Sequence, residues 1–209
     1  MTLGAVIFDY GMVLTGPPDP KAHSELLRIT GLPADKLDDL YWADRPAFDD
    51  GRLSGLAYWQ QFARQAELAL SHAEIAELIH WDARLWMTLN PAMFAWQNQL
   101  KARGLRTAIL SNMGDTVLDA MKQEFDWLGR FDVLVWSYQL RMAKPDAKIY
   151  LHVLDQLGMQ PAETLFIDDR QANIDAARAL GIRALTFTST EKLRQDLIAA
   201  GPDNQLPLP

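Results

Sequence analysis

The sequence lacks cysteine altogether, and it also lacks any long apolar run and any excess of positive charge. Without cysteine the protein has no disulfides, no thiolate metal sites and no cysteine nucleophile, which suits a reducing compartment. No uninterrupted apolar stretch approaches the roughly 20 residues needed to cross a membrane, so we expect no membrane partner. The net charge of -7 argues against non-specific nucleic-acid binding, which depends on basic surface, so we expect no nucleic-acid partner either.

The first residues show no secretion signal. They run directly into the apolar segment 5–8, without a basic start, a long apolar stretch or a small-residue cleavage site. We therefore expect a cytoplasmic protein. With 209 residues, of which 49% are hydrophobic, the chain can bury a substantial core.

Five short apolar runs alternate with segments of helical spacing. We expect strands at residues 5–8, 107–110, 133–136, 164–167 and 184–187. Helix-end signals lie between them, for example Asn90-Pro91 at the start of one helix, Gly158 at the end of another and Ser189 as a cap for the last. This alternation predicts an α/β fold with a doubly wound parallel sheet.

The segment between the first two strands breaks this alternation. About 70 residues without a convincing strand are too many for a simple crossover, so we expect an inserted helical cap. The predicted division is a core of residues 1–15 and 90–201, a cap of residues 16–89 and a flexible tail of residues 202–209. The cap contains four tryptophans, most of which we expect to fill its own small core: Trp42, Trp59, Trp81 and Trp86.

Polar side chains follow the predicted strands where a ligand would bind in an open parallel sheet, beyond the carboxyl ends. They are Asp9, the pair Ser111-Asn112, Lys144 and the pair Asp168-Asp169. Each has an ordinary structural explanation, because acids, serine and asparagine cap turns and helices, and a Lys-Pro pair usually lies in a solvated loop. The acidic pair is the hardest to explain in that way, because two adjacent acids repel each other unless a cation joins them.

Together these residues suit phosphoryl transfer, which needs an in-line nucleophile, a divalent cation and donors for the phosphate oxygens. Asp9 and Asp169 can supply the one or two carboxylates that Mg²⁺ takes, with Asp168 in direct or water-mediated support. Lys144 offers a positive charge to the phosphate and would keep Asp9 ionised. Ser111 and its neighbouring N–H groups can bind phosphate oxygens.

In their order along the chain these motifs resemble the haloacid dehalogenase superfamily. The resemblance covers nearly the whole chain and rests on residues 6–13 with Asp9, 109–112 with Ser111 and Asn112, 142–146 with Lys144, and 166–170 followed by Asn173. It implies a Rossmann-like sheet of order 5-4-1-2-3, a helical cap that closes over the substrate, and a phosphoric monoester hydrolase that forms an aspartyl phosphate at Asp9. The wording of the third and fourth motifs is most similar to the bacterial α-D-glucose-1-phosphate phosphatase branch, with the phosphatase domain of soluble epoxide hydrolase as a neighbour.

One departure from the family pattern concerns the leaving group. The family's second aspartate, two residues after the nucleophile, is Gly11 here. A glycine keeps the backbone carbonyl that ligates the metal, but it removes a general acid and base that typically contributes about 10²–10⁴-fold. Either the substrate has a good leaving group, such as an anomeric or acyl phosphate, or another group supplies the proton, or the chain is a weak phosphatase.

Two other functions stay open. A metal-independent 2-haloacid dehalogenase would need no leaving-group acid, but those enzymes resemble one another in lacking the acidic pair that Asp168-Asp169 provides here. A non-catalytic binding protein would explain Gly11 but not the retention of Asp9, Ser111 and Lys144 together. We therefore expect a Mg²⁺-dependent phosphatase that acts on a small organic phosphate ester, for example a sugar phosphate, as a monomer or homodimer.

The cap is expected to select the substrate, because it covers the pocket and varies independently of the chemistry. Trp42, Arg45 and Asp49 are the candidate contacts, although for any one of them a solvated, charge-paired helix surface is the alternative. We expect Arg45→Ala to change KM or substrate range more than the folded state.

Overall fold

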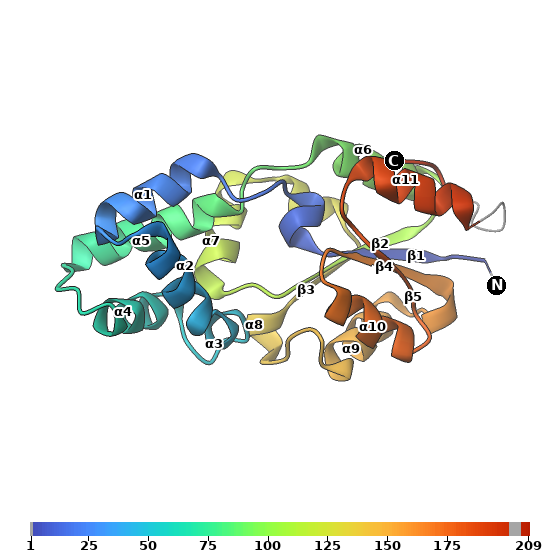
Figure 1. The fold of residues 1–209 in the computed structure, drawn as a ribbon. Helices are drawn as coiled ribbons and strands as arrows, with labels where there is room; N and C mark the ends of the chain where they lie inside the picture. The colour runs from blue at the N-terminus through green and yellow to red at the C-terminus, as the bar shows by residue number, and fades with distance from the viewer. Residues whose placement is uncertain (1, 201–205) are drawn as a thin grey trace.

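The structure is a computed structural model, and it describes residues 2–200 and 206–209. Its centre is a sheet of five parallel strands in the order β3-β2-β1-β4-β5 (Figure 1). The strands are β1 (Ala5–Phe8), β2 (Arg106–Ser111), β3 (Val133–Trp136), β4 (Thr164–Asp168) and β5 (Arg183–Thr186). Read from the other edge this is the predicted order 5-4-1-2-3, and the predicted Rossmann-like α/β fold is confirmed.

Helices cover both faces of the sheet, and this explains why its strands are mostly apolar. Alternate residues of β1 belong to two separate cores, Val6 and Phe8 to one and Ala5 and Ile7 to the other. The first core is closed by α6 (Pro91–Ala102), α7 (Asp115–Glu124) and α11 (Thr190–Ala199). The second is closed by α9 (Ala147–Leu157) and α10 (Gln171–Ala179), on the opposite side in Figure 1.

Five helices lie between β1 and α6, beyond the carboxyl ends of the strands (Figure 1). They are α1 (Pro20–Thr30), α2 (Ala34–Ala43), α3 (Arg45–Asp49), α4 (Gly55–Gln65) and α5 (His72–Leu85). Two linkers connect them to the sheet and pair with each other, because Gly16 N–H donates to Thr88 O at 2.8 Å and Asn90 N–H to Leu14 O at 2.8 Å. We call these helices and linkers the cap; its exact boundaries at residues 16 and 89 stay a prediction.

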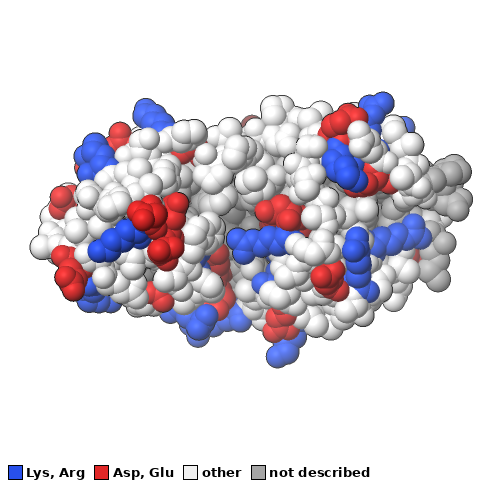
Figure 2. Space-filling model, viewed as in Figure 1, with Lys and Arg blue, Asp and Glu red and all other residues white. Residues whose placement is uncertain are grey.

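Short elements complete the chain. They are η1 (Tyr10–Leu14), η2 (Trp127–Arg130), α8 (Ser137–Leu140) and η3 (Pro161–Glu163). In η1 the dihedrals of Gly11 and Met12 are not helical, so the chain turns sharply just after β1. No helix in the described part of the chain is long and apolar enough to cross a membrane. Charged side chains of both signs are interspersed over the face shown in Figure 2.

Of the expected helix-end signals, two act as predicted and one does not. Ser189 caps α11, and Gly158 ends α9 in the left-handed conformation. Asn90, in contrast, makes no capping bond and donates instead to Val13 O at 3.3 Å. Of the predicted flexible tail, residues 202–205 lie outside the described residues, whereas Pro207 is held in place because its carbonyl accepts a hydrogen bond from Trp96 Nε1 at 2.7 Å.

Candidate active site

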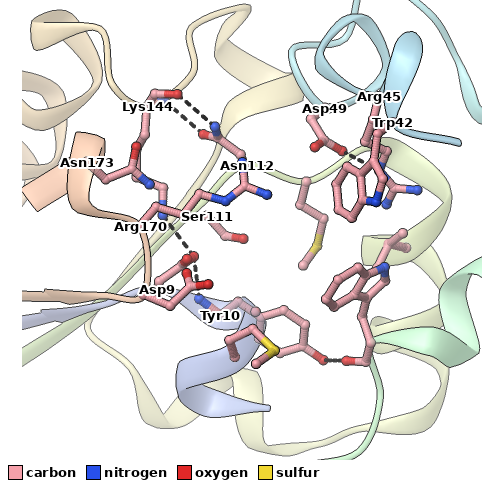
Figure 3. Close-up of a pocket in the computed structure, with 16 residues that line it drawn as sticks. Asp9, Tyr10, Trp42, Arg45, Asp49, Ser111, Asn112, Lys144, Arg170 and Asn173 are labelled. Carbon is pink, nitrogen blue, oxygen red and sulfur yellow. Dashed lines mark hydrogen bonds and ion pairs between the residues drawn. The ribbon is translucent and has the colours of Figure 1, made fainter. Parts of the chain in front are cut away.

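A pocket of about 100 Å³ lies between the carboxyl ends of the strands and the cap. Core and cap both line it, and Figure 3 shows Asp9 and Lys144 on one side of it and Asp49 and Trp42 on the other. The structure brings most of the predicted site residues to this pocket: Asp9, Gly11, Trp42, Arg45, Asp49, Ser111, Asn112, Lys144 and Asp169. Asp168 lies behind them and does not line the pocket.

Asp9 is held at the end of β1 by its neighbours on both sides. Its backbone N–H donates to Ile167 O at 2.8 Å, and its Oδ1 accepts a hydrogen bond from Tyr10 N–H at 2.7 Å. The same Oδ1 lies 2.8 Å from Lys144 Nζ. Its carboxylate therefore has a fixed direction at the floor of the pocket.

Lys144 joins two carboxylates, since its Nζ lies 2.6 Å from Asp168 Oδ2 as well. Burial favours the neutral amine, but Asp9 and Asp168 outweigh it and raise the pKa of Lys144, so the side chain is a cation. For Asp9 the balance differs: burial raises its pKa to about 7, although Lys144 acts in the opposite direction. Lys144 thus favours the ionised form of Asp9, as expected, but desolvation of the carboxylate outweighs the ion pair.

The acidic residues at the ends of β1 and β4 form a cluster that suits a cation. Asp9, Asp168 and Asp169 each place one carboxylate oxygen within 4.8 Å of the others. Oxygen donors in this number fit Mg²⁺, which takes few carboxylates and keeps waters and substrate oxygens. Burial and the nearby Asp168 raise the pKa of Asp169, so the ionised carboxylate is disfavoured there. A bound cation would stabilise the ionised form.

Asp168 differs from the other two acids in its surroundings. It is fully buried, and both oxygens already accept hydrogen bonds: Oδ1 from Arg170 N–H at 2.8 Å, and Oδ2 from Lys144 Nζ at 2.6 Å. Asn173 Nδ2 lies within 3.0 Å of both oxygens. Asp168 therefore fixes Lys144 and the start of α10, while Asp9 and Asp169 face the pocket.

Ser111 and Asn112, at the end of β2, have different roles. Ser111 Oγ belongs to a residue that is almost fully buried yet lines the pocket, as a phosphate-binding hydroxyl requires. Asn112 also lines the pocket, but its amide is engaged with the backbone of Lys144. Its Oδ1 accepts from Lys144 N–H at 2.8 Å, and its Nδ2 donates to Lys144 O at 2.9 Å (Figure 3). Asn112 thus holds the loop that carries the lysine.

On the cap side, Arg45 forms a buried ionic network and no solvated surface. Its Nη1 lies 2.7 Å from Asp82 Oδ1 and 2.5 Å from the Tyr41 hydroxyl, and its Nε lies 3.1 Å from Asp49 Oδ1. The Asp82 side chain is completely buried. The alternative of a solvated helix surface is therefore wrong for Arg45, which is buried and paired with Asp82, whereas Asp49 is charge-paired with Arg45 and only partly buried.

Two of the cap tryptophans line the pocket instead of filling the cap interior. Trp59 is fully buried, as predicted, but Trp42 is 45% exposed and contacts the edge of Trp86, with ring centroids 6.4 Å apart. Trp42 also packs against Arg170, whose Cζ lies 5.8 Å from its ring centroid. This contact joins the cap to the end of β4.

Several pocket residues were not found from the sequence. Met12, Trp86, Met113 and Val117 give the pocket an apolar side, and Arg170 adds a cation. No local pattern distinguishes these residues from ordinary core or surface side chains. Only Arg170, which follows the acidic pair directly, carried a signal that could have identified it.

Gly11 lies in the pocket lining with space around it. Its dihedrals, φ -61° and ψ 137°, are open to any residue, and a Cβ atom there would lie 3.9 Å from the Trp86 ring. The missing second aspartate is therefore not excluded by crowding, and no side chain of Gly11 can deliver a proton.

Comparisons with known proteins identify the family of the chain. The family model described as haloacid dehalogenase-like hydrolase matches residues 52–181, more than half of the chain. A phosphatase of Mycobacterium tuberculosis is 26% identical over 95% of this chain and 93% of its own length. A sesquiterpene phosphatase of Aspergillus oryzae is 27% identical over 90% of this chain and 92% of its own.

The fold is also shared with solved structures. The structure is similar, with a TM-score of 0.75 and 19% identity, to a haloacid dehalogenase family enzyme of Bacteroides thetaiotaomicron in complex with magnesium and inorganic phosphate. The two chains overlap over 89% of this one and 94% of the other. The predicted superfamily is confirmed, and the narrower resemblance to the glucose-1-phosphate phosphatase branch stays a prediction.

Proposed function

The chain belongs to the haloacid dehalogenase-like hydrolases, and on that premise we propose that it is a Mg²⁺-dependent phosphatase of small organic phosphate esters. The observation that carries the proposal is the arrangement of Asp9, which lies 2.8 Å from Lys144 Nζ with Asp169 beside it on the pocket floor. The phosphatases among its relatives support it.

In this reaction one Asp9 oxygen attacks phosphorus, forms an acyl phosphate and displaces the alcohol, and water then attacks phosphorus to release inorganic phosphate. Lys144 and Ser111 bind the phosphate oxygens and stabilise the charge that develops there. Asp9 and Asp169, together with the Gly11 carbonyl, would hold Mg²⁺. When bound, the metal draws negative charge from the phosphate and keeps Asp9 ionised.

The size and lining of the pocket support a small substrate. A volume of about 100 Å³ is well below the roughly 300–1,000 Å³ of pockets for drug-sized ligands. Sugar phosphates or short acyl and aryl phosphates are of suitable size. The apolar side formed by Trp86, Met113 and Val117 would contact the organic part of the ester.

The test is phosphate release from a panel of small phosphate esters with Mg²⁺, repeated with EDTA, together with halide release from 2-chloropropionate. We expect phosphate release that EDTA abolishes and no halide release. Metal-independent halide release would overturn the proposal in favour of a dehalogenase. No turnover of any ester would favour a non-catalytic binding protein.

A further inference from the structure

We propose that Asp49, from the cap, is the general acid and base that replaces the aspartate missing at Gly11. The inference rests on the proposed phosphatase function, because it assigns a proton donor to that reaction. It makes the cap part of the catalytic site.

The end of α3 is anchored onto the core, and this fixes the backbone of Asp49. The Asp49 carbonyl accepts a short hydrogen bond from Ser137 Oγ, and the same Oγ accepts one from Met113 N–H at 2.9 Å. Gly51 lies so close to the core that a Cβ atom there would come within 2.5 Å of Tyr138 O. With φ +76°, it also adopts a conformation that favours glycine. Asp49 is therefore positioned by the core as much as by its own helix.

The Asp49 side chain faces the pocket from the side opposite Asp9 (Figure 3). Only 17% of it is exposed. Its Oδ1 accepts the hydrogen bond from Arg45 Nε, and among the described residues none donates a hydrogen bond to Oδ2. One oxygen thus fixes the orientation of the carboxyl group, and the other is available to carry a proton.

The charges around Asp49 suit a group that both gives and takes a proton. Burial, with a smaller contribution from Asp82, raises the pKa of Asp49 to about 6. The positive charges of Arg45 and Arg170 lower the pKa and partly offset this rise. A general acid and base is most efficient when its pKa lies near the working pH. Arg45 would also stabilise the carboxylate that remains after the proton has left.

Among the described residues that line the pocket, no other can take this role. Of its titratable groups, Asp9 is the nucleophile and Asp169 a metal ligand in the proposed reaction, and the lysine and arginines are cations. The Tyr10 hydroxyl donates to Trp86 O at 2.7 Å, and burial raises its pKa above the ordinary value. Asp49 is the acid that remains.

The proton balance closes over the two steps. In the first, Asp9 forms its bond to phosphorus, the ester P–O bond breaks, and Asp49 Oδ2 gives its proton to the departing oxygen. In the second, the Asp49 carboxylate takes a proton from water as the water oxygen attacks phosphorus. The acyl phosphate P–O bond breaks, inorganic phosphate leaves, and both aspartates return to their starting states.

The test compares Asp49→Asn with the wild type on phenyl phosphate and p-nitrophenyl phosphate, with Mg²⁺. The two esters are similar in size, but p-nitrophenolate leaves without a proton far more easily than phenolate. Asparagine keeps the shape of the side chain and an oxygen for Arg45. We expect kcat/KM for phenyl phosphate to fall by about 100-fold or more, and that for p-nitrophenyl phosphate by less than about tenfold.

Two further variants separate catalysis from packing. Asp50→Asn changes the adjacent carboxylate, which pairs with Arg52 outside the pocket, and should leave both rates unchanged. Adding Gly11→Asp to Asp49→Asn should restore much of the activity on phenyl phosphate, because it returns an acid beside the leaving group.

Equal losses on both esters, or no loss on either, would overturn the assignment of Asp49 while leaving the phosphatase intact. A wild-type protein that releases phosphate from neither these esters nor the wider panel would instead remove the proposed function itself. The two failures are therefore distinguishable.

Discussion

The contact between Phe48 of the cap and Gly114 of the core allows a direct test of how the cap is seated. A Cβ atom at Gly114 would lie 2.2 Å from Cε2 and Cζ of the Phe48 ring. Carbon atoms in ordinary contact are about 3.5–4.0 Å apart, so Gly114→Ala requires a shift of more than about 1 Å. The Gly114 backbone itself is unstrained, with φ -79° and ψ 171°.

The Phe48 ring is enclosed by its neighbours. It is fully buried, its centroid lies 5.1 Å from that of Tyr58 in a stacked arrangement, and Arg45 Cζ lies 4.8 Å from it. The shift must therefore move α3, which carries Asp49 next to Phe48. Overpacking of this kind costs about 1–3 kcal/mol. A misplacement of about 1 Å can cost about 100-fold in rate.

We expect Gly114→Ala to lower the midpoint of thermal unfolding by about 2–12 °C, at about 2–4 °C for each kcal/mol in a chain of this size. We expect kcat/KM to fall by about 100-fold. Gly129→Ala is the matched control, because a Cβ atom there meets no heavy atom within 4 Å. Thermal unfolding and phosphate-release kinetics measure both effects. A Gly114→Ala protein with wild-type stability and kcat/KM would refute the described packing of the cap on the core.

Three other perturbations follow from the site. Asn112→Ala removes both hydrogen bonds to the Lys144 backbone and should lower kcat by about 100-fold, as steady-state phosphate release would show. Arg45→Ala leaves Asp82 as an unpaired buried charge and should destabilise the fold by about 3–5 kcal/mol in urea unfolding, contrary to the milder effect expected from the sequence. Below pH about 7 the metal-free protein holds a proton on Asp9 that Mg²⁺ must displace. In calorimetric titrations the affinity of the protein for Mg²⁺ should therefore rise about tenfold per pH unit from pH 5 to 7 and level off above pH 7.

Each of these has a control or a contradicting result. Asn98→Ala, on the exposed surface of α6, should leave kcat unchanged, and an equal loss there would remove the argument for Asn112. An Arg45→Ala protein as stable as the wild type would contradict the buried network. A Mg²⁺ affinity that does not change between pH 5 and 8 would contradict the raised pKa of Asp9.

The fold and the chemical residues of the core could be predicted because both depend on short-range patterns. Apolar runs of strand length mark the sheet, and in a parallel sheet the residue after each run lies at a shared edge. Asp9, Ser111 and Asp169 are brought together by that rule alone. Lys144 lies in a loop, and its position depends on Asn112, yet the motif around it was sufficient to find it.

The cap side of the site could not be predicted to the same depth, because it depends on contacts between distant segments. Arg45 and Asp49 look like surface residues in the sequence, and only the packing of α3 against α5 shows that Asp82 neutralises Arg45 in the interior. Trp42 and Trp59 look alike in the sequence, but one lines the pocket and the other fills the cap core. The helical pattern indicates that a cap exists but not which of its faces meets the sheet.

The central claim is that Asp9 is transiently phosphorylated, and borohydride trapping tests it most directly. The wild-type protein would be mixed with Mg²⁺ and a phosphate ester that it hydrolyses, and the reaction would be quenched with borohydride. The protein would then be digested and its peptides sequenced by mass spectrometry. Borohydride reduces an acyl phosphate to an alcohol, so the account predicts homoserine at position 9, dependent on substrate. Phosphate release with an unmodified Asp9, or with the modification at another acid such as Asp169, would contradict it.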